Sequence, residues 1–206
     1  MGGLKRLLVW LKRFRYRCGY GVHSPFAFDF ITNVVYEKTP YYAYRQIEQV
    51  AIDNKDSRHI KKNILSPKVN QFLFRLVNRM QPTTIIDAGG SGKTTLYLQA
   101  GKKTAGYMPV TSSINWETLG QPENIFLYIG WPDKPQLVET LFNDGVGRVG
   151  QKSVFVIQGI YNSSAMKELW KRLVADERVG ITFDLYDLGV LFFDKSKIKQ
   201  HYIVNF

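Results

Sequence analysis

The sequence is poor in residues that form covalent or metal cross-links. It has one cysteine, Cys18, and 3 histidines in 206 residues. A single cysteine excludes an intramolecular disulfide and is typical of a reducing compartment. Scattered histidines beside one cysteine argue against a structural zinc site, because such a site needs several Cys or His ligands held together. We therefore expect the fold to depend on its apolar core.

Long apolar runs are also missing. No stretch approaches the roughly 20 apolar residues of a membrane-spanning helix. The patch at 7–11 is short and is bounded by lysine and arginine, unlike a secretory signal. Arg6 stands where a myristoylation signal has Ser or Thr. These features predict a cytoplasmic protein.

Acidic residues are scarce in the first part of the chain. Residues 1–81 hold 15 Lys and Arg against 5 Asp and Glu, a net of +10, whereas residues 82–206 hold 13 against 12. The formal net charge of +11 therefore belongs almost entirely to the first segment. We interpret 1–81 as a basic N-terminal helical layer and 82–206 as an α/β domain. The length suits one such unit with an appendage.

Residues 4–17 have the pattern of a basic amphipathic helix. Apolar residues recur at helical spacing, at Leu4, Leu7, Leu8, Leu11 and Phe14, and Lys or Arg fills most other positions. Such a helix can lie on its own domain, a membrane surface, nucleic acid or an acidic partner. We expect it to dock on the protein with a solvated basic face. A homo-oligomer is also compatible with the sequence.

Periodicity changes near residue 84. Before it, helices are predicted at 25–37, 41–54 and 67–80, the first capped by Ser24 with Pro25 in its first turn. After it, strands and helices alternate, with strands predicted at 84–88, 106–112, 125–129, 153–158, 180–186, 189–194 and 201–205, and helices at 94–101, 134–143 and 163–175. The predicted fold is α/β, with a mostly parallel sheet that ends in an antiparallel hairpin.

The strand at 84–88 runs into a glycine-rich turn at 89–92 and then a helix, an arrangement suited to a nucleotide-like ligand. A P-loop is one interpretation, because Gly92-Lys93-Thr94 resembles its end. However, Asp87 stands where that motif requires its first glycine. The G-x-G-x-x-G spacing of a dinucleotide-binding turn is absent.

The segment Ile85-Ile86-Asp87-Ala88-Gly89 resembles the first motif of the class I methyltransferases that use S-adenosylmethionine. The chain is similar to a bacterial group of that family along most of its length. The shared segments are His23-Ser24-Pro25-Phe26, Tyr41-Tyr42-Ala43, Ile47-Glu48, Tyr97-Leu98, the hairpin 182–193 and His201-Tyr202. The resemblance implies a Rossmann-like sandwich, S-adenosylmethionine as cofactor and a small-molecule acceptor.

The resemblance also assigns the site residues. The cofactor would be bordered by Asp87, Gly89, Gly90, Ser91 and Gly92. No catalytic acid or base is evident, so positioning for in-line displacement at the methyl group would carry catalysis. No metal is expected.

The sequence departs from the family pattern at the positions that carry chemistry. The family's ribose-binding acid would follow the second strand, where the sequence reads Thr111-Ser112-Ser113. Ile129 replaces an acid at the end of a later strand, and Gln158-Gly159 replaces acids that hold a metal in related O-methyltransferases. Residues 115–124 are too few for a usual strand and helix, so one β-α unit is predicted to be missing.

We therefore expect a methyltransferase-like protein with reduced or lost activity, and as the alternative a non-enzymatic binding module that uses its basic segment. The aromatic residues Tyr128, Trp131 and Tyr161 lie at the predicted C-terminal ends of strands, where they would either stack on a ligand or fill the crevice. Asp184 and Asp187, in the hairpin, are predicted to face solvent.

Overall fold

The computed structural model describes residues 3–16, 19, 21–53, 65–89, 92–119 and 124–206. Cys18, Gly90 and Ser91 lie outside the described residues, as does the predicted end of the first helix at residue 17.

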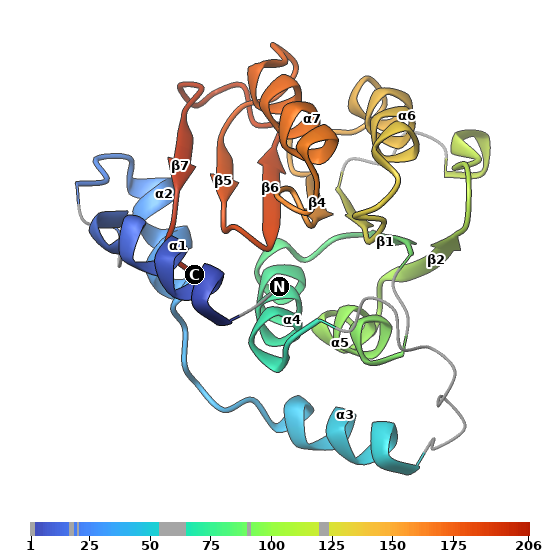
Figure 1. The fold of residues 1–206 in the computed structure, drawn as a ribbon. Helices are drawn as coiled ribbons and strands as arrows, with labels where there is room; N and C mark the ends of the chain where they lie inside the picture. The colour runs from blue at the N-terminus through green and yellow to red at the C-terminus, as the bar shows by residue number, and fades with distance from the viewer. Residues whose placement is uncertain (1–2, 17–18, 20, 54–64, 90–91, 120–123) are drawn as a thin grey trace.

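A seven-stranded sheet forms the centre of the protein (Figure 1), with strand order β2-β1-β3-β4-β6-β5-β7. The strands are β1 (Thr84–Ala88), β2 (Gly106–Val110), β3 (Ile125–Ile129), β4 (Val154–Gln158), β5 (Thr182–Asp184), β6 (Leu188–Phe192) and β7 (His201–Ile203). β1 pairs in parallel with β2 and with β3, and β3 pairs in parallel with β4. β6 runs antiparallel to β4 and β5, and β7 pairs in parallel with β5. The predicted fold class, a mostly parallel sheet ending in an antiparallel hairpin, is confirmed.

Helices cover both faces of this sheet, because alternate strand residues point to opposite sides. One core joins Ile85 and Phe126 to the N-terminal helices and to α5, and a second joins Ile86 and Leu127 to α6 and α7. The helices on the first face are α2 (Pro25–Phe30), the π-helical turn η2 (Ile31–Val35), α4 (Pro67–Met80) and α5 (Lys93–Gly101); those on the second are α6 (Pro135–Val146) and α7 (Ser164–Ala175). The boundary proposed at residue 81 stays a prediction.

Helix starts follow the expected capping chemistry. Ser24 Oγ accepts a hydrogen bond from the Ala27 amide at 3.3 Å, and Ser66 Oγ accepts one from the Val69 amide at 3.4 Å. A proline follows each capping serine, where a missing N–H costs nothing. One face of α4 is buried, at Val69, Phe72, Leu73, Leu76 and Val77.

The connection between β2 and β3 is short. Its described part contains the 3-10 helix η4 (Trp116–Leu119), and β3 pairs directly with β1. β2 therefore stands at the sheet edge, as the missing β-α unit predicts.

The N-terminal helix α1 (Gly3–Lys12) is followed by the 3-10 turn η1 (Phe14–Tyr16), and α3 (Tyr42–Asp53) lies further along the chain. Docking of α1 on the protein is confirmed: the Asn205 side chain donates to the Trp10 carbonyl at 3.2 Å, and the Asn205 amide donates to the Tyr16 carbonyl at 3.1 Å. The solvated basic face is confirmed at Lys12 and Arg15, which are exposed. The apolar residues do not all turn inward, since Leu8, Leu11 and Phe14 are also exposed. Arg13, which follows α1, adds a further polar contact, with Asp184. None of the described helices is long and apolar enough to cross a membrane.

Candidate functional site

The carboxyl ends of β1, β3 and β4 lie side by side, because these strands are parallel neighbours. Their following residues, Gly89, Gly130 and Gly159, share one edge of the sheet, which is where open α/β sheets bind ligands. The sequence-predicted turn therefore lies at the expected place.

The carboxylate of Asp87, the acid that precedes this turn, is hydrogen-bonded to neighbouring side chains. It is only 2% exposed. Its Oδ2 accepts from the Tyr107 hydroxyl at 2.6 Å and from Thr95 Oγ1 at 3.0 Å. Burial, followed by the bond to Asp87, raises the pKa of Tyr107 well above its ordinary value, so the phenol remains a donor. Asp87 thus joins β1 to β2 and α5.

The indole of Trp131 packs on Gly89. Gly89 has φ of +93°, and a methyl group there would lie 2.2 Å from Trp131 Nε1. Gly130 is also tightly packed, since a methyl group on it would lie 2.9 Å from the Gly89 carbonyl oxygen. Of the remaining turn residues, Gly92 caps α5 with φ of +54°. At Gly89 the glycine accommodates a protein side chain.

Lys93 turns toward α3 rather than into the turn. Its Nζ forms an ion pair with Glu48 at 2.5 Å, and the Tyr97 hydroxyl donates to the same carboxylate at 3.2 Å. Burial and the neighbouring Glu48 raise the pKa of Tyr97 to about 12. The lysine charge is therefore balanced by a residue of the helical layer.

Further along the edge, Tyr128 and Gln158 form a buried pair. The Tyr128 hydroxyl donates to Gln158 Oε1 at 2.6 Å, and burial raises the pKa of this tyrosine far above its ordinary value. Gly159 is packed against Pro132, whose Cβ would lie 2.4 Å from an added methyl group. Tyr128 is therefore engaged by a protein side chain, and Trp131 lies against the glycine turn. In the described part of the chain, no three His, Cys, Asp or Glu residues are grouped as metal ligands.

A second polar cluster lies at the ends of β4 and β5. Arg13 binds Asp184 in a bidentate pair, with Nη1 at 2.8 Å from Oδ1 and Nη2 at 3.1 Å from Oδ2. The Tyr161 hydroxyl donates to Asp184 Oδ2 at 2.6 Å, and the Tyr186 amide donates to Oδ1 at 2.9 Å. Burial, then the bond to Asp184, raises the pKa of Tyr161 to about 12.

The two tyrosine rings of this cluster hold the guanidinium. Tyr161 and Tyr186 stack with centroids 5.3 Å apart, and Arg13 Cζ lies 5.3 Å and 5.2 Å from their centroids. The prediction that Asp184 faces solvent is wrong, because its side chain is 1% exposed. The partner that buries it lies 171 positions earlier, so no local pattern could have found it. Asp187 is half-buried.

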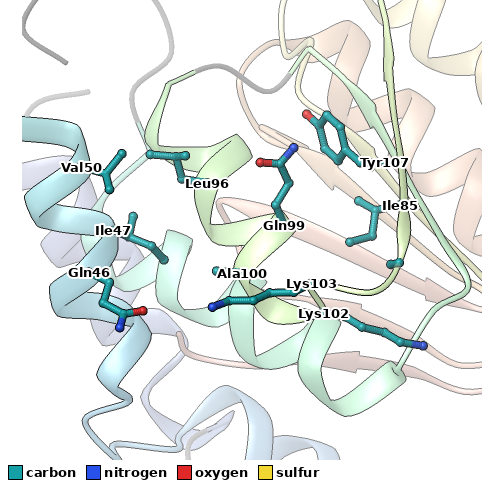
Figure 2. Close-up of a pocket in the computed structure, with 11 residues that line it drawn as sticks. Gln46, Ile47, Val50, Ile85, Leu96, Gln99, Ala100, Lys102, Lys103 and Tyr107 are labelled. Carbon is teal, nitrogen blue, oxygen red and sulfur yellow. The ribbon is translucent and has the colours of Figure 1, made fainter.

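Two cavities lie away from the glycine turn. The cavity of Figure 2, about 400 Å³, is formed between α3, α5 and β2, with Ile47, Leu96 and Tyr107 among its walls. The other, about 560 Å³, is lined by Trp10, Arg13, Lys68, Tyr186 and Phe206 among others. Neither is lined by Asp87 or Gly89.

Comparisons with known proteins find a shared fold. No protein-family model matches the chain, and no curated protein matches it in sequence. Among solved structures, the SAH-bound methyltransferase PaMTH1 of Podospora anserina is similar, with a TM-score of 0.53 and 11% identity over 82% of this chain and 96% of that one. Cofactor-bound Rv0187 from MTB has a TM-score of 0.52 and 12% identity over 72% and 90%. The chain therefore has the class I methyltransferase fold.

Proposed function

We propose that the chain is a methyltransferase-fold protein whose methyl transfer is reduced or lost, and that it works by binding. The main support for this proposal is the packing of Trp131 on Gly89. In a cofactor site of this kind, the glycine turn lets a ligand approach the backbone. In this chain the indole of Trp131 lies where such a ligand would approach Gly89.

The residues at the turn do not fit S-adenosylmethionine in this arrangement. Asp87 Oδ2 already accepts hydrogen bonds from Tyr107 and Thr95. The segment after β2 offers hydroxyls at Thr111, Ser112 and Ser113 where a ribose would need a carboxylate, and a neutral hydroxyl makes a weaker hydrogen bond. The roles assigned to Gly90, Ser91 and Gly92 remain predictions.

The shared fold supports the alternative that this chain still binds the cofactor, because PaMTH1 is SAH-bound and Rv0187 is cofactor-bound. Under that alternative, Asp87, Gly89 and Gly92 would border S-adenosylmethionine, and a small-molecule acceptor would bind beside it. The two cases are separated by cofactor affinity, since loss of the site removes binding as well as turnover.

The test is calorimetric titration and thermal unfolding with S-adenosylmethionine and S-adenosylhomocysteine. Ligand at a hundredfold over Kd stabilises a protein by about 2.7 kcal/mol. We expect no heat of binding and no thermal shift at millimolar ligand. A saturable shift with either compound overturns the proposal. ATP with Mg²⁺ is titrated in parallel, and a shift there would favour the P-loop interpretation.

Trp131→Ala tests the role of the indole. If the side chain blocks the turn, this variant gains measurable affinity for S-adenosylhomocysteine that the wild type lacks. Trp10→Ala is the matched control, because it removes an indole from α1 and should leave ligand binding unchanged. Absence of binding by both variants assigns the loss to the missing carboxylate after β2.

A further inference from the structure

Part of the exposed surface of α1 and η1 is apolar. Four large side chains are exposed there, and we call them the apolar ridge: Leu8 (51% exposed), Trp10 (40%), Leu11 (55%) and Phe14 (52%). The rings of Trp10 and Phe14 meet edge to face, with centroids 5.3 Å apart. Single exposed apolar residues are ordinary, whereas a contiguous group of four marks an interaction surface.

Polar contacts attach the same segment to the protein. Arg13 is held by Asp184, and Asn205 binds the backbone at Trp10 and Tyr16. In Figure 1, α1 lies beside β7 and the C-terminus, on the outside of the molecule. The ridge is therefore presented by a helix whose orientation is already fixed, which lowers the entropy cost of binding.

The charge around the ridge has one sign. Residues 1–28 contain 6 Lys and Arg and no Asp or Glu. Of these cations, Lys12 and Arg15 are exposed, within a few residues of the ridge. Whatever binds here must accept apolar side chains and balance positive charge.

We infer that the apolar ridge docks on an anionic lipid bilayer surface. Leucine, tryptophan and phenylalanine enter the boundary between headgroups and acyl chains, and lysine and arginine attract anionic headgroups. Lys12 and Arg15 have aliphatic stems long enough to keep their charges at headgroup level. This inference stands independently of whether the glycine turn binds a cofactor.

Other occupants fit the surface less well. A second copy of the chain would bring two sets of cations together with no acid among residues 1–28 to offset them. Nucleic acid would meet the cations but leave the leucines against phosphates. An anionic bilayer satisfies both parts of the surface.

The experiment is co-sedimentation of the full chain with vesicles of phosphatidylcholine alone and of phosphatidylcholine with phosphatidylglycerol in equal parts. Binding is expected to the anionic vesicles and to weaken with added salt. The emission of Trp10 should shift to the blue on binding, and Trp10→Phe should remove that shift while sedimentation continues.

Variants separate the ridge from other exposed residues. Leu8→Ser with Leu11→Ser should weaken binding about tenfold or more, because two buried leucine side chains are lost. Ile198→Ser is the matched control, since Ile198 is 81% exposed but lies outside α1, and it should bind as the wild type does. Lys12→Glu should weaken binding more than Lys152→Glu.

Three outcomes would overturn the inference. One is equal sedimentation with both kinds of vesicle or with neither. Another is a wild-type affinity for the Leu8→Ser, Leu11→Ser variant. The third is a dimer on size-exclusion chromatography that the same variant dissociates, which would assign the ridge to a second copy. Circular dichroism confirms that each variant is folded before its result is used.

Discussion

Arg13 and Asp184 form a bidentate ion pair between the segment after α1 and the end of β5, 171 positions apart in sequence. The side chains are 11% and 1% exposed, and Tyr161 and Tyr186 complete the shell around the carboxylate. This pair, with the two contacts of Asn205, holds the basic segment on the domain.

Removing the cation of this pair should be costly. Arg13→Ala leaves a buried carboxylate without its charge partner, and we expect a loss of about 3 kcal/mol in the free energy of unfolding. Urea unfolding followed by circular dichroism measures it. Arg79→Ala is the control, because its pair with Asp29 is exposed (59% and 39%), and pairs of that kind contribute less than about 1 kcal/mol.

The charge itself can be tested by a second substitution. Asp184→Asn in the Arg13→Ala background removes the uncompensated charge and should recover part of the lost stability. Equal stability of Arg13→Ala and the wild type would contradict the role given to this pair.

Packing at the glycine turn predicts that Gly89→Ala is strongly destabilising. The added methyl group meets the Trp131 indole at a positive φ, so we expect a loss of roughly 2–4 kcal/mol. Gly21→Ala is the matched control, because Gly21 has φ of +76° with no heavy atom within 4 Å of the added methyl group. Its expected cost is about 1 kcal/mol, from backbone strain alone.

The contact with the indole is isolated by repeating Gly89→Ala in a Trp131→Ala background. There the cost should fall toward that of Gly21→Ala, since the clash is gone. An unchanged cost in the two backgrounds would mean that Trp131 does not rest on Gly89 in solution. The measurement is again the free energy of unfolding in urea.

Stability should fall at alkaline pH. Tyr161 and Tyr97 have pKa values raised to about 12, whereas an unfolded tyrosine ionises near pH 10. Between these values the folded state holds protons that the unfolded state has lost, so stability is full below about pH 10 and decreases as pH rises toward about 12. Unfolding free energies measured across that interval test this.

The same series identifies the groups responsible. Tyr161→Phe and Tyr97→Phe should each flatten the alkaline decrease, because each removes a phenol that cannot ionise easily in the fold. Tyr42→Phe should keep the wild-type profile, since Tyr42 is 87% exposed. A decrease that is identical in all four proteins would place its origin elsewhere.

Local patterns predicted most of the framework. The strands at 84–88 and 125–129 match β1 and β3 residue for residue, because β-branched and apolar runs bounded by turns need only their own sequence to be recognised. The strand predicted at 180–186 is shorter, Thr182–Asp184, since Asp184 turns its carboxylate to Arg13 and Tyr186 takes φ of +71°. The short connection between β2 and β3 was predictable because residues 115–124 are too few for a further strand and helix.

The candidate site was predictable in place but not in content. The order of strand, acid and glycine located the turn at the sheet edge. The cofactor-bordering role of Asp87 stays a prediction. Its hydroxyl partners Tyr107 and Thr95, 20 and 8 positions later, were not found from the sequence. The burial of Arg13 against Asp184 was likewise not predictable, because Arg13 is one of several cations in this segment and its partner is distant. Such contacts depend on distant partners, which periodicity does not report.

The contacts that hold α1 have a consequence for protein synthesis. The partner of Arg13, Asp184, is synthesised 171 positions later, and the partner of the Trp10 carbonyl, Asn205, is synthesised 195 positions later. All the residues between these partners must be synthesised before the contacts can form, since domains fold as the chain emerges. Until then, the basic segment lacks the contacts that hold it on the fold.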